Sequence, residues 1–100
     1  FPGHSLSDEI LMRKADIFLN LGLIDDALDC FKKIEDDWNY DILADDALYK
    51  RAVIYDYNLK NYPKAMELYE RLISNYSSSI YVAEARNRYR KLRGDKFILE

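Results

Sequence analysis

The sequence predicts an all-helical protein built from repeated helix pairs. One pattern of small and large apolar residues occurs twice, with an offset of 37 residues in its first half and 38 in its second. The first copy consists of Leu11, Ala15, Phe18, Ala27, Phe31 and Ile34. The second copy consists of Leu48, Ala52, Tyr55, Ala65, Tyr69 and Leu72. Only three Gly and two Pro occur among 100 residues, so helices have few interruptions. Such a fixed repeat indicates an array of stacked helix hairpins, and we place the additional residue of the second copy in its internal loop.

Two helices are expected in the first copy. The first begins near Ser5 or Ser7, because either hydroxyl can cap free backbone amides. It ends at Gly22, because Gly readily adopts the left-handed conformation that closes a helix. The second helix runs from about Leu23 to Asp36. Its expected buried positions are Ala27, Leu28, Phe31 and Ile34.

The second copy predicts a third and a fourth helix. The third runs from about Ile42 to Leu59, with Asp41 as its cap. Its expected buried positions are Leu48, Ala52, Tyr55 and Leu59. Trp38 and Tyr40 are expected to pack across the joint before it. Pro63 fits the first turn of the fourth helix, because the amides of that turn have no acceptor within the helix.

A fifth helix follows. Ser78 or Ser79 can cap it, and it reaches about Leu92, with Gly94 as its expected terminator. Five alanines recur at positions where neighbouring helices would cross: Ala15, Ala27, Ala52, Ala65 and Ala85. A small side chain at a crossing allows helix axes to approach to about 8–10 Å. We therefore expect these alanines to be buried.

These positions resemble the tetratricopeptide repeat. That resemblance implies a right-handed superhelical array of helix-turn-helix repeats, with about five helices in this chain. Residues 1–4 would be the tail of a preceding repeat, 5–37 repeat one, 42–75 repeat two, 79–93 a final helix and 94–100 a tail. The chain would then be a piece of a longer protein. The repeats are longer than usual, and in this they resemble bacterial cell-envelope repeat proteins, which implies a periplasmic or envelope location over the cytoplasm.

In the family, the first helix of each pair lines a concave groove that binds proteins or peptides. The resemblance therefore implies a non-catalytic interaction scaffold whose partner is a protein or peptide. By register, the residues expected in the groove are Met12, Asp16, Leu19, Asn20, Tyr49, Val53, Asp56, Tyr57, Val82, Arg86, Tyr89 and Arg90. Ordinary exposed helix surface is the alternative interpretation of these positions.

The net charge of −3 conceals an asymmetry. Residues 1–50 carry a net charge of −7 and residues 51–100 one of +4. Two solvated helix faces would explain this, but so would a segment that caps a larger array or self-associates through oppositely charged ends. The cations Arg86, Arg90 and Arg93 form one stripe of the last helix, with Arg88 and Lys91 nearby. A third possibility is thus a basic last helix that binds an acidic ligand or nucleic acid, which the acidic overall charge disfavours.

Catalysis and cofactor binding have little support in the sequence. His4 is the one histidine, and no Cys or carboxylate stands at ligand spacing from it, so we expect no metal site. No nucleophile, base and orienting group can be assembled around it, and no Gly-rich phosphate loop occurs. Cys30 is the one cysteine and is expected to be a small buried apolar residue rather than a reactive thiol. We expect no enzyme activity, no cofactor and no membrane span in this segment.

Overall fold

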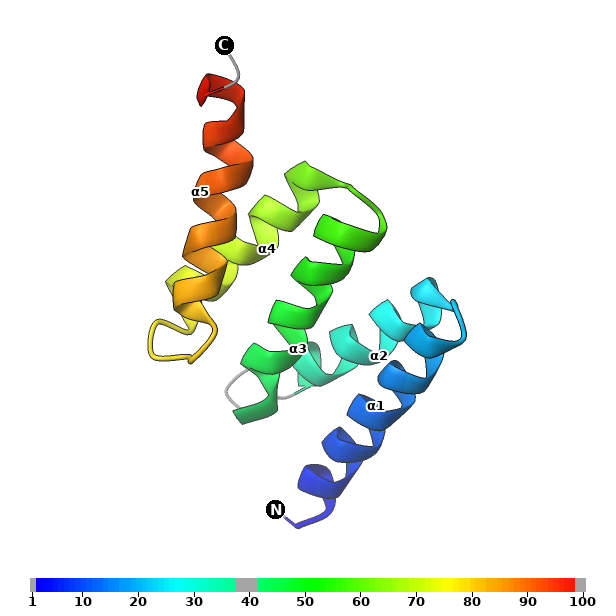
Figure 1. The fold of residues 1–100 in the computed structure, drawn as a ribbon. Coiled ribbons are helices and arrows are strands. Elements are labelled where there is room, and N and C mark those ends of the chain that lie inside the picture. Colours follow the sequence, from blue (N-terminus) through cyan, green and yellow to red (C-terminus); the bar gives the residue numbers. More distant parts are fainter. Residues whose placement is uncertain (1, 38–41, 99–100) are drawn as a thin grey trace. The chain divides into compact units, whose positions relative to one another are not determined.

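The computed structural model describes residues 2–37 and 42–98, and the side chains of residues 9–36 and 43–94. This part of the chain forms helices and no strand (Figure 1). The helices are α1 (Pro2–Asn20), α2 (Ile24–Asp37), α3 (Ile42–Val53), the π-helix η1 (Ile54–Asn58), α4 (Tyr62–Asn75) and α5 (Val82–Ile98). The all-helical prediction is confirmed. The chain divides into two compact units, Phe1–Ala47 (unit 1) and Leu48–Glu100 (unit 2), and the division falls within α3.

Unit 1 is built around the α1–α2 hairpin, in which the chain folds back on itself at Gly22 (Figure 1). The amide of Leu23 donates to the carbonyl of Phe18 at 2.8 Å, and the amide of Gly22 donates to that of Leu19 at 3.0 Å. Gly22 has a φ of +81°, as the Schellman helix end requires. The predicted helix end is confirmed.

The core of unit 1 contains the predicted apolar positions of α1 and α2. Ala15, Ala27, Phe31 and Ile34 have no exposed surface, and Leu28 is 9% exposed. Cys30 is 7% exposed, and burial raises the pKa of its thiol. The prediction of a buried, unreactive cysteine therefore agrees with its surroundings.

Unit 2 has a separate core. It joins α3, α4 and α5 through Leu48, Ala52, Ala65, Leu68, Tyr69, Leu72 and Ala85, all without exposed surface. A shell of partly buried side chains packs against it, most of them tyrosines: Tyr49, Tyr55, Ile73, Tyr76, Tyr81, Tyr89 and Leu92. All five predicted crossing alanines, in both units, are fully buried.

Several predicted boundaries need correction. α1 begins at Pro2, so Ser5 and Ser7 lie inside the helix rather than at its cap. α5 begins at Val82 and continues through Gly94 to Ile98, so Gly94 does not terminate it. Leu59 is 44% exposed rather than buried, because the helix before it changes geometry. The predictions for Trp38, Tyr40 and Asp41 lie outside the described residues.

That change of geometry is the π-helix η1. Its closing hydrogen bond runs from the amide of Leu59 to the carbonyl of Ile54, five residues back instead of four. A π turn accommodates one residue more than an α turn. The additional residue of the second copy therefore lies in the end of this helix, and its predicted place in the loop is wrong.

Candidate partner-binding surface

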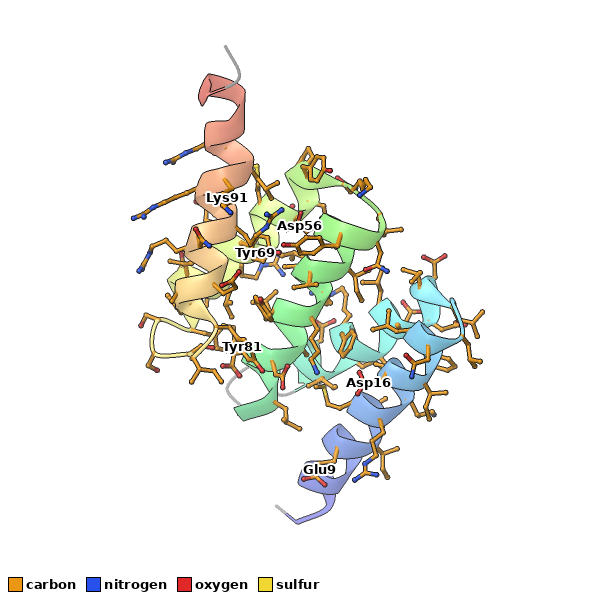
Figure 2. All side chains as sticks on the ribbon, in the orientation of Figure 1. Glu9, Asp16, Asp56, Tyr69, Tyr81 and Lys91 are labelled. Carbon is orange, nitrogen blue, oxygen red and sulfur yellow. The ribbon has the colours of Figure 1, made fainter. Side chains whose placement is uncertain are left out.

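The groove residues predicted in unit 1 all lie on α1. Asp16 and Asn20 are exposed, and Met12 and Leu19 are half-buried. Asp16 is labelled on this helix in Figure 2. Unit 1 therefore offers two polar side chains to a partner, beside two apolar ones that are partly covered.

In unit 2, Asp56 differs most from the prediction. It was expected to face a partner, but its side chain is 1% exposed and holds a buried polar network. Its carboxylate accepts a hydrogen bond from the Tyr69 hydroxyl at 2.8 Å (Figure 2). It also accepts two from the Arg88 guanidinium, from Nε and Nη2, each at 2.8 Å. The groove position of Asp56 was inferred from the α-helical register of repeat one. A π turn changes the directions of the side chains in it, so that inference fails at Asp56.

The network raises the pKa values of Tyr69 and Arg88. Burial and the hydrogen bond to Asp56 raise the pKa of the Tyr69 hydroxyl, so it stays protonated and donates. The hydrogen bonds to Asp56 raise the pKa of Arg88 above its ordinary value. Bidentate hydrogen bonds between a guanidinium and a carboxylate are roughly twice as strong as neutral ones. Asp56, Tyr69 and Arg88 thus connect η1, α4 and α5.

Tyr57 lies on the exposed side of this network. Its ring centroid is 4.8 Å from Cζ of Arg88, at cation–π distance, and the residue is 52% exposed. Asp56 holds Arg88 in place, so the Tyr57 ring packs on a guanidinium of fixed position. About half of the Tyr57 surface faces solvent. A pre-ordered, exposed tyrosine suits contact with a protein, since little side-chain entropy is lost on binding.

Tyr49 is mainly a packing residue. Its ring stacks on Tyr81, with centroids 4.5 Å apart and planes 12° from parallel, and it also contacts Tyr69 at 6.3 Å. Burial raises the pKa of its hydroxyl. Val53 is half-buried and Val82 is 8% exposed. These predicted groove residues therefore support the fold more than they offer surface.

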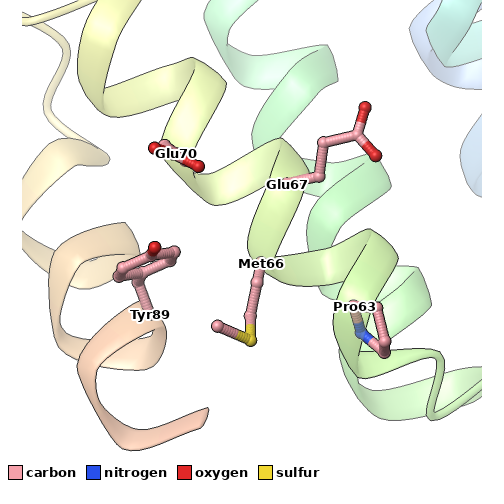
Figure 3. Close-up of a pocket in the computed structure, with 5 residues that line it drawn as sticks. All are labelled: Pro63, Met66, Glu67, Glu70 and Tyr89. Carbon is pink, nitrogen blue, oxygen red and sulfur yellow. The ribbon is translucent and has the colours of Figure 1, made fainter. Parts of the chain in front are cut away.

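The predicted residues of α5 divide between two environments. Arg86 and Arg90 are exposed, whereas Tyr89 lines an open pocket of about 370 Å³ between α4 and α5. Pro63, Met66, Glu67 and Glu70 of α4 complete its lining, and Met66 extends toward the Tyr89 side (Figure 3). The Arg93 guanidinium lies 5.4 Å from the Tyr89 ring centroid.

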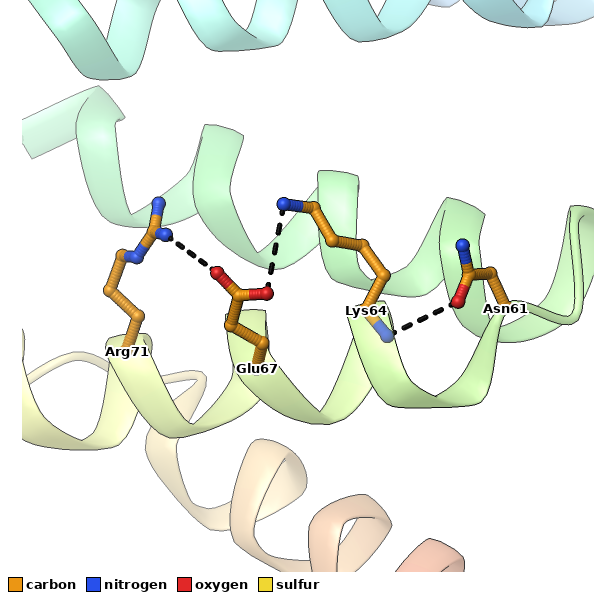
Figure 4. Close-up of polar contacts among 4 residues, drawn as sticks. All are labelled: Asn61, Lys64, Glu67 and Arg71. Atoms are coloured by element: carbon orange, nitrogen blue, oxygen red, sulfur yellow. Dashed lines mark hydrogen bonds and ion pairs between the residues drawn. The ribbon is translucent and has the colours of Figure 1, made fainter.

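The outer face of α4 is occupied by its own polar contacts (Figure 4). Asn61 caps the helix, accepting from the Lys64 amide at 3.3 Å, and Pro63 takes the first turn as predicted. Glu67 pairs with Arg71 at 3.2 Å and with Lys64 at 3.7 Å. These exposed pairs are each worth at most about 1 kcal/mol. They occupy part of the solvated surface of α4.

Sequence reasoning missed two residues that organise the surface. Arg88 was grouped with the cations of the last helix, but it is half-buried and pairs with Asp56. Tyr81 had no predicted role, but it stacks on Tyr49. Neither contact has a local sequence signal, because the partners lie 32 residues apart in each case.

Comparison with known families identifies the fold. A model of the tetratricopeptide repeat matches residues 8–35, and a second model of the same repeat matches residues 46–79. Together they cover more than half of the chain, and the chain belongs to the tetratricopeptide repeat family. Neither the curated proteins nor the solved structures gave a match. Repeats of this family are generally protein–protein interaction modules.

None of the helices described is both long and apolar enough to cross a lipid bilayer. No group of three or more His, Cys, Asp or Glu side chains in residues 9–36 and 43–94 is arranged to hold a metal ion.

Proposed function

We propose that this chain is a non-catalytic interaction segment of a larger repeat protein, and that it binds a protein or peptide through first-helix residues of its repeats. The observation that carries the proposal is Tyr57, an exposed aromatic side chain fixed against Arg88 in a chain of this family. In unit 2 the binding surface combines Tyr57 with Val53. In unit 1 it consists of Met12, Asp16 and Asn20.

The experiment compares two tyrosines of similar exposure. Tyr57 is 52% exposed and Tyr62, at the start of α4, is 42% exposed. Tyr57→Ala should abolish capture of the natural partner by the immobilised chain, whereas Tyr62→Ala should leave it unchanged. Circular dichroism checks that both variants keep the wild-type helix content. Equal capture by both variants would exclude the surface around Tyr57.

A second candidate function rests on the cations of α5. Arg86, Arg90, Lys91 and Arg93 are all exposed in the same two turns. Such a cluster would attract an acidic ligand or a phosphate backbone, with affinity that falls steeply as salt rises. Titration with a single-stranded oligonucleotide at 50 mM and 200 mM salt tests it, and Arg86→Ala with Arg90→Ala should remove the salt-sensitive part. No binding at 50 mM salt would exclude this function.

A further inference from the structure

The outer face of α1 carries large apolar side chains in contact with solvent. Ile10 is 49% exposed, Ile17 is 55% exposed and Leu21 is 66% exposed. Ile10, Lys14 and Ile17 stand at positions i, i+4 and i+7 of α1 and share one side of the helix. Leu21 directly follows α1, and its amide donates to the carbonyl of Ile17 at 3.0 Å, so it extends the same side by one turn. We call Ile10, Lys14, Ile17 and Leu21 the α1 stripe. A contiguous exposed apolar stripe in an otherwise solvated helix indicates an interaction site.

The repeat supplies an internal comparison. The 37-residue offset places Ala47, Arg51 and Ile54 at the positions of Ile10, Lys14 and Ile17. These three residues are 0%, 4% and 3% exposed. The same apolar–cation–apolar pattern is thus buried in the second copy of the repeat and exposed in the first.

The cation recurs a third time at the same offset. Lys14, Arg51 and Arg88 are each 37 residues apart. Arg51 is buried, and the side chain of Arg88 is 19% exposed, where it meets the carboxylate of Asp56 at 2.8 Å with two hydrogen bonds. Covering a cation among apolar groups is costly unless a carboxylate receives it. Lys14 is the exposed member of this series.

We infer that the α1 stripe is the docking site for an amphipathic partner helix with a carboxylate in the middle of its apolar face. Aliphatic side chains of that helix cover Ile10, Ile17 and Leu21. Its Asp or Glu receives the Lys14 ammonium, as Asp56 receives Arg88 in unit 2. The site goes beyond the proposed binding surface, because its residues differ from Tyr57 in unit 2 and from Met12, Asp16 and Asn20 on α1, and because it specifies the chemistry of its partner.

The test uses two designed helical peptides of about 20 residues that differ at one position. Both carry a leucine stripe, and the central residue of that stripe is Glu in one peptide and Lys in the other. The full chain is titrated with each fluorescein-labelled peptide and anisotropy is measured. The Glu peptide should bind the wild-type chain at least tenfold more tightly than the Lys peptide.

Variants of the chain then locate the contact. Lys14→Glu should weaken binding of the Glu peptide at least tenfold and should restore binding of the Lys peptide. Lys33→Glu, the same charge change at an exposed site of α2, should have little effect. Ile17→Ser should weaken both peptides. Lys14 and Ile17 are exposed, so helix content should be unchanged.

Three results would overturn the inference. The first is no binding of the Glu peptide to the wild-type chain, and the second is an equal effect of Lys14→Glu and Lys33→Glu. The third is a dimer in sedimentation that Ile17→Ser dissociates, since the stripe would then be covered by a second copy of the chain. Loss of partner capture by Tyr57→Ala is independent of all three.

Discussion

At the scale of single residues, Asp56 has the largest consequences. A carboxylate that is 1% exposed is tolerated because two partners donate three hydrogen bonds to it. The composition of the chain gives no sign of this, since Asp56 is one of 18 acidic residues and most of those described are exposed. Its role follows from the π turn and from an arginine 32 residues away.

Asp56→Ala should destabilise the chain by about 3–5 kcal/mol, because it leaves the Arg88 guanidinium without its carboxylate. Urea unfolding followed by circular dichroism measures the change in the free energy of unfolding. Asp36→Ala is the matched control, since Asp36 pairs with Lys32 at 2.9 Å but both side chains are more than half exposed. That substitution should cost less than about 1 kcal/mol. Similar losses for the two variants would contradict the network.

Because of Tyr69, the free energy of unfolding should decrease at alkaline pH. Its pKa is raised in the folded state, so its contribution to stability is complete below the ordinary tyrosine value of about 10. As pH rises above that value, the unfolded state loses this proton first and stability falls. Urea unfolding at pH 8 and pH 10.5 should show the loss, and Tyr69→Phe should lose less stability over the same interval. An identical pH dependence for Tyr69→Phe would contradict the assignment.

At the scale of elements, the sequence predicted helices better than their ends. α2 follows its predicted range closely, and Pro63 lies in the first turn of α4 as predicted, because apolar spacing and the proline are encoded locally. The start of α1, the end of α5 and the π turn were missed. Gly94 was expected to end α5, yet a helix tolerates a single Gly at a cost of about 1 kcal/mol relative to Ala. The π turn has no composition of its own, so only the change of offset from 37 to 38 indicates it.

Lys60 offers a test of the turn that follows η1. It stands 38 residues after Gly22, and both residues have a positive φ, of +53° and +81°. A residue with a side chain costs about 1–2 kcal/mol of stability in the left-handed region. Gly avoids this cost, but it loses more backbone entropy on folding, which offsets part of the gain. Lys60→Gly should therefore raise the free energy of unfolding by up to about 1 kcal/mol. Gly22→Ala should lower it by a similar amount, and thermal unfolding of both variants would show opposite shifts.

At the scale of the whole molecule, two units each have their own core. The fold class could be predicted because the repeat pattern recurs along the chain. The candidate site could be predicted only in part. Tyr57, Asp16, Arg86 and Arg90 are exposed as expected, but Asp56, Val82 and Tyr49 are wholly or partly buried, because long-range contacts override helical register. The envelope location stays a prediction.

Separate cores predict local unfolding. Phe31→Ala creates a cavity in the core of unit 1 and should cost about 3–5 kcal/mol there. Repeat proteins distribute stability among neighbouring elements, so amide exchange should accelerate most in α1 and α2 and less in α4 and α5. Hydrogen exchange with peptide-level mass spectrometry measures both. Uniform acceleration along the chain would indicate a single cooperative unit instead.

The buried sulfur of Cys30 has a practical consequence for experiments on this chain. Because its thiol is both covered and hard to ionise, a maleimide dye should react far faster with a cysteine introduced on the surface, for example Ser74→Cys at the end of α4. Native Cys30 can then remain in place, and site-specific fluorescent labels can follow the chain without disturbing the packing of its first helix pair.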